Sequence, residues 1–131
     1  MTGSGHRQRV SSGSPYEKTI GFSRAVRVGN RVLVSGTAPV WPDGTVDPDS
    51  AIQTRRCLEI ILNALGQAGA QAEDVVRTRI YLTPAADTTA VGATMGEVFG
   101  DIRPTSTMVI VNALLDPRWV VEIEAEAVVD D

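Results

Sequence analysis

The sequence predicts an α+β sandwich in which two helices cover one face of a mixed sheet of about six strands. Two apolar patterns recur at helical spacing, and several short runs rich in β-branched residues are separated by glycine, proline or polar residues. The chain has 131 residues, which is enough for a single domain with one modest core.

The domain is expected to span residues 16–131, after a flexible segment over residues 1–15. The stretch from Met1 to Ser14 is polar and rich in serine and glycine, so it does not read as a signal peptide. Within it, a short strand is permitted only at Arg7 to Val10. Apolar runs fall well short of the roughly 18 residues that span a bilayer. We therefore expect a cytoplasmic protein that makes no membrane contact.

The first regular element is a hairpin centred on Gly29-Asn30. Runs rich in valine, at residues 25–28 and 31–35, flank this pair. Such an arrangement is typical of a type I′ or II′ turn. The following stretch, residues 38–49, contains three prolines and a glycine and is expected to be a loop.

Two helices follow from capping and periodicity. Asp49 or Ser50 can cap a helix whose apolar side chains recur on one face, and Gly69 is a plausible stop. Asp87 or Thr88 could open a second helix, which is expected to have one apolar face and to end at Gly100.

Three more strands are expected at residues 75–82, 105–111 and 120–129. The segments Val32–Val34 and Met108–Val111 are apolar at successive positions, which is typical of strands buried on both faces. Because the helices can cover only one face, another copy of the chain is expected to cover the second.

Composition argues against several classes of function. The net charge is −4 and the pI about 4.9, so a general nucleic-acid binder is not expected. His6 is the single histidine, which disfavours a Ser-His-Asp triad and a histidine-based metal site. Cys57 falls on the apolar helix face, where a buried, inert thiol is expected. We expect neither a metal nor a cofactor.

The run from Val121 to Ala127 alternates between apolar residues and glutamate. On a strand, Glu122, Glu124 and Glu126 share one face. One interpretation is a half-solvated strand with an acidic outer face. The other is that one glutamate lies in a cleft, has a raised pKa, and accepts hydrogen bonds or positions a water molecule.

Hydroxyl groups and arginines supply further candidates. Arg103 is followed by Pro104 and by a strand start that contains Ser106 and Thr107, whose hydroxyls could bind a carboxylate or a carbonyl or could simply suit a strand. Arg24 and Arg27 fall on opposite faces if both are extended. Each is either solvated or a ligand for an anion.

Three stretches resemble the signatures of the YjgF/RidA (L-PSP) family. Val34–Pro39 resembles its "SGQxP" segment, and Ile20–Ala25 resembles "GPYSQA". Arg103–Val109, taken with Val121–Ala125, resembles "RPARSxV … VEIEAxA". The resemblance covers roughly residues 16 to 129.

The resemblance implies a chorismate-mutase-like fold, a barrel-like homotrimer and ligand clefts between subunits. It also implies hydrolysis of reactive enamines and imines, such as 2-aminoacrylate, to ketoacids and ammonia without a cofactor. By the same resemblance, Gly36 provides a backbone turn in the cleft and Glu122 helps to position the attacking water.

The chain departs from the family pattern where the substrate carboxylate would be held. Ser106 stands where the family has its catalytic arginine, and shifting the alignment by one residue gives only Thr105 or Thr107. Phe22 replaces a cleft tyrosine, and Gly96 replaces a cleft asparagine. We therefore assign the chain to a subgroup that lacks the catalytic arginine.

Losing the partner of a buried charge typically costs about 2–5 kcal/mol, so 2-aminoacrylate is expected to bind poorly. Arg24 or Arg103 could take over the missing role. Alternatively, the ligand is neutral or larger and is recognised by Ser106, Thr107 and Glu122.

Several functions stay open at this point. The first is a hydrolase of an enamine, imine or related carbonyl derivative, with Glu122 orienting water. The alternative is a non-catalytic trimer that binds a small ligand or serves in protein interactions. The family's endoribonuclease label fits least well, because the chain is acidic and no histidine lies in the predicted domain to act as a general base.

Overall fold

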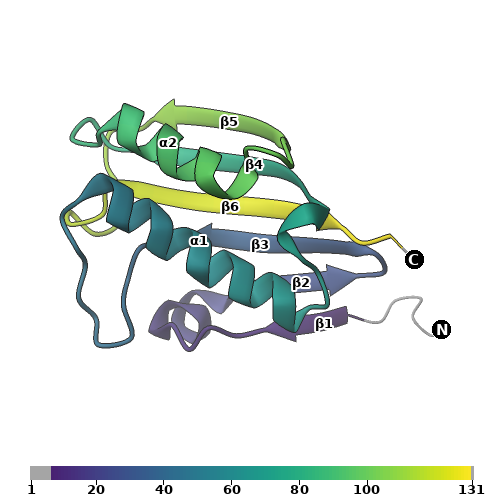
Figure 1. Ribbon diagram of the computed structural model, residues 1–131. Helices are drawn as coiled ribbons and strands as arrows, with labels where there is room; N and C mark the ends of the chain where they lie inside the picture. The colour runs from purple at the N-terminus through teal and green to yellow at the C-terminus, as the bar shows by residue number, and fades with distance from the viewer. Residues whose placement is uncertain (1–6, 131) are drawn as a thin grey trace.

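The computed structural model describes residues 7–130, which form a six-stranded sheet with two α-helices. The helices are α1 (Ser50–Gln67) and α2 (Thr88–Phe99). The strands are β1 (Arg7–Val10), β2 (Ala25–Val28), β3 (Arg31–Thr37), β4 (Val75–Leu82), β5 (Thr105–Ile110) and β6 (Val121–Val128). Figure 1 shows their arrangement.

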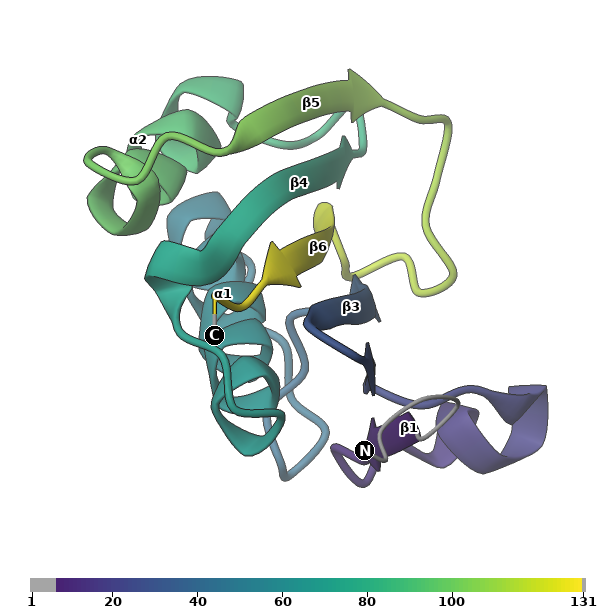
Figure 2. The same cartoon turned by 90° about the vertical axis from the view of Figure 1, so that its right-hand side faces the viewer.

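The sheet order is β1-β2-β3-β6-β4-β5. The β4–β5 pair is parallel and the other pairs are antiparallel, so the sheet is mixed. Both α-helices lie on the same side of it (Figure 2). The predicted fold class is thereby confirmed. The strand permitted near the N-terminus is present as β1, paired with β2, whereas residues 1–6 of the predicted flexible segment lie outside the described residues.

Glycine conformations and a side-chain cap explain the type of hairpin turn and where α1 begins and ends. Gly29 has φ +60° and Asn30 does not have a positive φ, which selects the type II′ turn over I′. Asp49 caps α1 by accepting a hydrogen bond from the Ile52 amide. At the other end Gly69, with φ +83°, closes α1 in a left-handed conformation. Two short elements were not expected, namely a π-helical turn, η1 (Glu17–Gly21), and a 3₁₀ turn, η2 (Ala72–Asp74).

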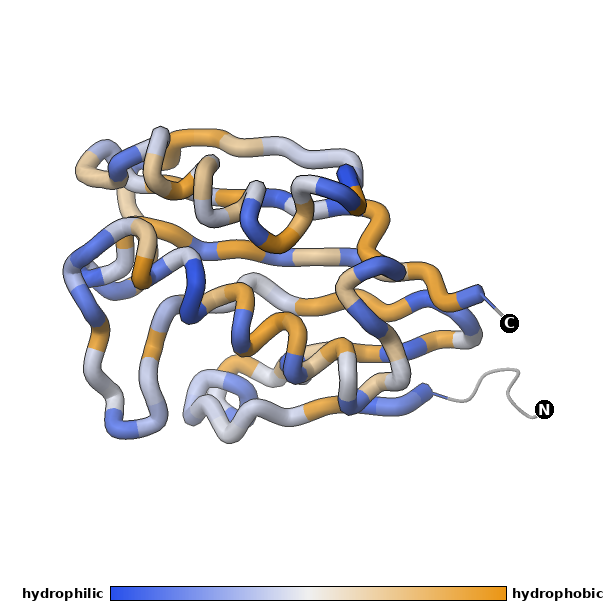
Figure 3. The backbone as a smooth tube through the Cα atoms, viewed as in Figure 1, coloured by the Kyte–Doolittle hydropathy of each residue, from blue (hydrophilic) through white to orange (hydrophobic). Residues whose placement is uncertain are grey.

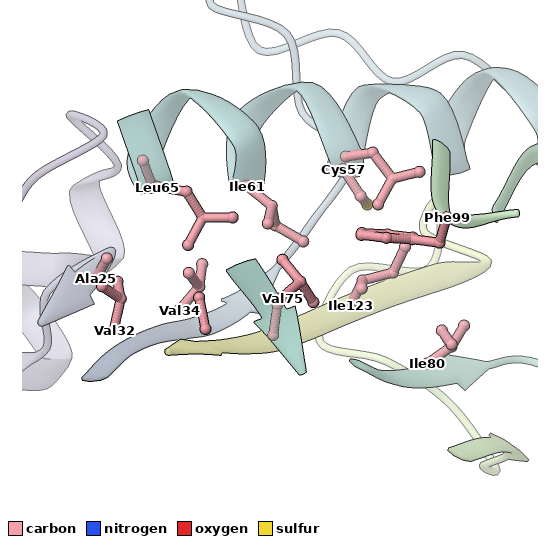
Figure 4. Close-up of a cluster of buried hydrophobic side chains, with 14 of the residues drawn as sticks. Ala25, Val32, Val34, Cys57, Ile61, Leu65, Val75, Ile80, Phe99 and Ile123 are labelled. Carbon is pink, nitrogen blue, oxygen red and sulfur yellow. The ribbon is translucent and has the colours of Figure 1, made fainter. Parts of the chain in front are cut away.

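The core lies between the helices and the sheet (Figure 4). Cys57, Ile61 and Leu65 of α1 face Val34 of β3 and Ile123 of β6, and all five are buried. Along β6 the buried apolar residues alternate with partly exposed glutamates, as the alternating bands of Figure 3 show. The predicted alternation of faces on this strand is therefore present.

The face of the sheet away from the helices is only partly covered within one chain. Leu33 of β3 is 42% exposed, and every residue of β5 is exposed. Near the middle of this face Arg79 donates a hydrogen bond to Glu124 and Arg31 donates one to Glu126. Apolar strand residues such as Leu33 thus remain open to solvent within one chain.

Candidate functional site

A cleft of about 670 Å³ opens at the end of the sheet where β3 ends and β6 begins. This end of the two strands is on the left in Figure 1. The chain reaches it from several directions, through the segment 12–22, the loops around residues 38–44 and 115–119, and one edge of α1. The residues that matter most for its chemistry are Phe22, Arg24, Gly36, Trp41, Trp119 and Glu122.

Gly36 and Glu122 meet across the β3–β6 pair. The pairing shifts register between Val34 and Thr37, and such a bulge re-aims the backbone beside it. A Cβ atom on Gly36 would lie 2.7 Å from Oε2 of Glu122. Glycine is therefore required here by the close approach of a carboxylate, not by an unusual φ.

The Glu122 carboxylate is partly buried and open to the cleft. Burial raises its pKa, the nearby Arg24 charge opposes that rise, and Glu124 adds to it. In the described part of the chain no protein donor is hydrogen-bonded to this carboxylate. A carboxylate with a raised pKa and free lone pairs can accept a proton from a bound water molecule.

Glu124 and Glu126, on the same face of β6, have a different role. Glu124 accepts hydrogen bonds from Arg79 and from the Tyr81 hydroxyl, and Glu126 accepts one from Arg31. The cleft position and the raised pKa expected of one glutamate are found at Glu122. Glu122 lies in a cleft, whereas the other two glutamates form ion pairs on the outer face.

Arg24 lies beneath the cleft and is only 6% exposed. Its Nη1 donates to the Gly36 carbonyl at 2.7 Å and to Oγ1 of Thr37 at 3.0 Å, with a longer contact to the Ser35 carbonyl at 3.5 Å. Its Nε donates to Oγ of Ser12. The guanidinium therefore holds the bulge in place and puts a positive charge near Glu122.

The segment that precedes η1, called here the N-terminal arm, is bonded to the cleft wall through Arg24. Oγ of Ser12 accepts from Arg24 and donates to Glu17, whose carboxylate also accepts from the Ser12 amide. These hydrogen bonds join the arm before η1 to the cleft wall. Arg24 also lies 5.4 Å from the Phe22 ring centroid.

Aromatic side chains form much of the remaining wall. The Arg56 guanidinium stacks 4.6 Å from the centroid of Trp41, and its Nε donates to the Val40 carbonyl. Tyr16 and Trp119 meet edge to face at 6.4 Å. Nε1 of Trp119 is buried and has no hydrogen-bond partner within residues 7–130.

The other predicted site residues lie away from this cleft within one chain. Ser106 and Thr107 belong to β5, at the opposite edge of the sheet from β1. Oγ of Ser106 accepts a hydrogen bond from Thr78 at 3.2 Å. Arg103 has φ +58° and its amide donates to the Phe99 carbonyl, so its backbone closes the turn that follows α2. The structure brings Phe22, Arg24, Gly36 and Glu122 together, but not these three.

Arg27 and Cys57 have structural surroundings. Arg27 donates to the Ala68 carbonyl at the end of α1, where a cation suits the helix dipole. The Cys57 thiol is fully buried, contacts the Thr37 carbonyl at 3.2 Å, and has a pKa raised mainly by burial. In the described range, no cluster of three or more ligating side chains could hold a metal ion.

Sequence reasoning missed Trp41, Arg56 and Trp119. Trp41 and Trp119 lie in loops with no local pattern, and Arg56 is one of several helix arginines. The rarity of tryptophan was the signal that could have found two of them, because the chain has only two tryptophans. Both line this cleft.

Comparison with known proteins agrees with the fold. Residues 14–129 match the family model described as Endoribonuclease L-PSP. The structure of Rv2704 from Mycobacterium tuberculosis, described as a member of the YjgF/YER057c/UK114 family, is 49% identical with a TM-score of 0.87, covering 95% of this chain and 100% of that one.

Two of the relatives carry the names of deaminases. The 3-aminoacrylate deaminase RutC of Acinetobacter baylyi is 36% identical over 105 residues, covering 79% of this chain and 82% of the relative. The 2-iminobutanoate/2-iminopropanoate deaminase of Escherichia coli K12 is 31% identical over 110 residues, covering 82% of this chain and 86% of the relative.

In residues 7–130 no helix is long and apolar enough to cross a membrane.

Proposed function

The chain belongs to the Endoribonuclease L-PSP family, which includes the YjgF/RidA proteins, and from this premise we propose that it hydrolyses imines or enamines in the cleft around Glu122. The observation that carries the proposal is the Glu122 carboxylate itself. It lies in a cleft, has a raised pKa and contacts no protein donor among the described residues. The deaminase names of two relatives support the same chemistry.

The proposed reaction consumes one water molecule and releases ammonia. Glu122 accepts a proton from water as the water oxygen bonds to the imine carbon, and the C=N π electrons move to nitrogen, which takes up a proton. Glu122 then returns its proton to the amine nitrogen of the carbinolamine, and the C–N bond breaks to release ammonia as the hydroxyl proton leaves to solvent and the C=O bond forms. An enamine enters this sequence after protonation at carbon and loss of a proton from nitrogen give the imine. No oxidant, metal or cofactor is consumed, and a raised pKa suits a group that accepts and returns the proton.

Arg24 has two parts in this proposal. It holds the Ser35–Thr37 backbone, which keeps Gly36 against Glu122. Its charge also favours the ionised form of Glu122, because it opposes the effect of burial on the pKa. Since Nη1 and Nε are committed to protein acceptors, Arg24 offers a substrate carboxylate less than a free bidentate fork.

The proposal includes a cytoplasmic homotrimer. The uncovered apolar residues of the sheet, such as Leu33, favour burial against other copies. In such an assembly β5 of one subunit would approach the cleft of the next, bringing Arg103, Ser106 and Thr107 toward Glu122. This arrangement is the one in which those three residues act on substrate.

A non-catalytic trimer that binds a small ligand is the second candidate. Ser106 in place of arginine, and the commitment of Arg24 to backbone carbonyls, both favour it. An endoribonuclease is not supported, because the chain carries a net charge of −4. Its single histidine, His6, lies outside the described residues.

Ammonia release from freshly generated imines tests the proposal. The purified protein is added to 2-aminoacrylate and to 2-imino acids of increasing size, and the rate is compared with spontaneous hydrolysis. Acceleration of at least one imine supports a hydrolase. Rates equal to the spontaneous ones across the panel would contradict it and leave the binding function.

A further inference from the structure

We propose that the ligand of this cleft carries an apolar group of aromatic size, so that the preferred imine has a ring-bearing side chain rather than a side chain of one or two carbons. This inference rests on the proposed function for the reaction, but the ligand class follows from the walls of the cleft. Five features of those walls support it.

The first feature is how the aromatic residues are distributed. The whole chain has two tryptophans, two tyrosines and two phenylalanines. Both tryptophans, with Tyr16 and Phe22, line this single cleft. Aromatic side chains supply broad, rigid contact surfaces at low entropic cost, so their gathering here indicates recognition of a flat apolar group.

The second feature is the fixed plane of Trp41. Arg56 stacks on this indole at 4.6 Å and is itself held by the Val40 carbonyl and by Glu59. A ring that is already immobilised loses little further freedom when a ligand packs on it. Trp41 is therefore a preorganised platform.

The third feature is the apolar rim. Ile20 is 61% exposed and Leu115 is 77% exposed, and both line the cleft. Large apolar side chains gathered at the mouth of a cleft are typical of a binding site. A short, polar imine would leave both of them in water.

The fourth feature is the unpartnered indole N–H of Trp119. This residue is 4% exposed, and its Nε1 has no acceptor among the described residues. A buried donor without an acceptor is costly, and a ligand acceptor would remove that cost. Within residues 7–130, this indole N–H is thus a buried donor without an acceptor in a residue of the cleft wall.

The fifth feature is that the arginines lining the cleft are already bonded to protein acceptors, so none offers a free bidentate guanidinium to a ligand. Arg118 is bidentate to Asp116, at 2.9 and 3.1 Å, and Arg24 is bonded to the bulge backbone. Arg56 is occupied by Val40 and Glu59. Because the cations of the cleft are already paired, affinity must come mainly from apolar burial. Burying a phenyl-sized group is expected to tighten binding by about 10- to 150-fold.

Binding can be measured without any reaction. Since both tryptophans line the cleft, intrinsic tryptophan emission reports its occupancy. Titration with 3-phenylpropionate should give a saturable change at concentrations at least ten-fold below any effect of propionate. Ile20→Ser should weaken 3-phenylpropionate about 3- to 10-fold. Val28→Ser, an exposed valine outside the cleft, should leave it unchanged.

A second measurement concerns the reaction. Imines made in situ from phenylalanine and from alanine by an amino acid oxidase are compared, and the phenylalanine imine should show a kcat/KM at least ten-fold higher. Equal efficiency on both imines, together with equal binding of the two acids, would contradict the aromatic ligand class. It would not contradict the proposed hydrolase activity. Tight binding of 3-phenylpropionate with no hydrolysis of either imine would support the aromatic ligand class and contradict the proposed hydrolase activity. No emission change with either acid would show that another part of the assembly fills the cleft, and would overturn the inference.

Discussion

At the scale of single residues, the separation of Glu122 from the other two glutamates of β6 defines the site. Its neighbours Glu124 and Glu126 are neutralised by arginines, whereas Glu122 faces Gly36 and the cleft. The sequence predicted that these three side chains share a face, because strand alternation is a local property. It could not predict which of them would remain unpaired, since that depends on Arg79 and Arg31, which lie on other strands.

The raised pKa of Glu122 predicts a pH-dependent cost to stability. Because the folded state favours the protonated form, the unfolding free energy falls as pH rises through the ordinary value of 4.5 and then through the higher folded pKa. Glu122→Gln removes this titration. We expect the variant to have a higher Tm than the wild type at pH 7, with the difference shrinking toward pH 4. Thermal unfolding across this range checks it, and a lower Tm at pH 7 would contradict it.

Gly36 is predicted to matter for activity more than for stability. In Gly36→Ala the new Cβ would lie 2.7 Å from Oε2 of Glu122, so the flexible carboxylate must move aside. A shift of about 1 Å at a reacting group can cost on the order of 100-fold in rate. We expect kcat/KM for the best imine to fall about 10- to 100-fold, with Tm within about 3 °C of wild type. An unchanged rate would show that Gly36 does not set the position of Glu122.

At the scale of elements, features set by local sequence signals were predicted, and features set by contacts between distant segments were not. The caps of both α-helices, at Asp49 and Asp87, accept hydrogen bonds from amides three residues on, and each was one of the two adjacent residues expected to cap its helix. The turn η1 was missed because the hydrogen bond from the Phe22 amide to the Glu17 carbonyl closes a π-type turn without a distinctive residue pattern. The β3–β6 bulge was missed as well, since it exists only between two strands far apart in sequence.

The helix α2 contains a weakness that can be corrected. Gly92 lies within it and is exposed, and a Cβ built there has no neighbour within 4 Å. Glycine in a helix interior costs roughly 0.5–1 kcal/mol relative to alanine. Gly92→Ala is therefore expected to raise Tm by about 2–5 °C and leave imine hydrolysis unchanged. A lower Tm would show that another group occupies the space beside this helix face.

At the scale of the whole molecule, the sheet face opposite the helices is the surface on which the proposed assembly would form. The sequence indicated that this face needs a cover, because consecutive apolar residues occur on β3 and β5. On this face Leu33 and Val109 are exposed within one chain, whereas Val32 and Val34 belong to the core. The number of subunits does not follow from this pattern, because it depends on the angle at which copies meet.

A pair of substitutions tests the proposed assembly. Ser106→Arg, on β5, is expected to raise activity toward 2-aminoacrylate by about 30-fold or more by restoring a charged partner for its carboxylate. Leu33→Asp should dissociate the assembly by placing a charge on the uncovered face, whereas Asn63→Asp on the exposed side of α1 should not. Size-exclusion chromatography with light scattering gives the subunit number.

The gain from Ser106→Arg should disappear in the double variant with Leu33→Asp, since β5 lies across the sheet from the cleft of its own chain. A gain that persists in the monomer would place Ser106 near its own Glu122 and contradict the shared site. The absence of any gain in a folded assembly would show that position 106 does not reach a bound carboxylate.

The most direct test of the central claim compares Glu122→Gln with Glu124→Gln on the best imine found. The two glutamates lie two residues apart on the same face of β6, and glutamine can still accept the hydrogen bonds that Glu124 receives from Arg79 and Tyr81. The measurement is kcat/KM for ammonia release, made after both variants are shown to keep the wild-type subunit number. The account predicts a loss of at least 100-fold for Glu122→Gln and less than about three-fold for Glu124→Gln. Full activity in Glu122→Gln, or equal losses in both variants, would contradict the assignment of Glu122 as the group that activates water.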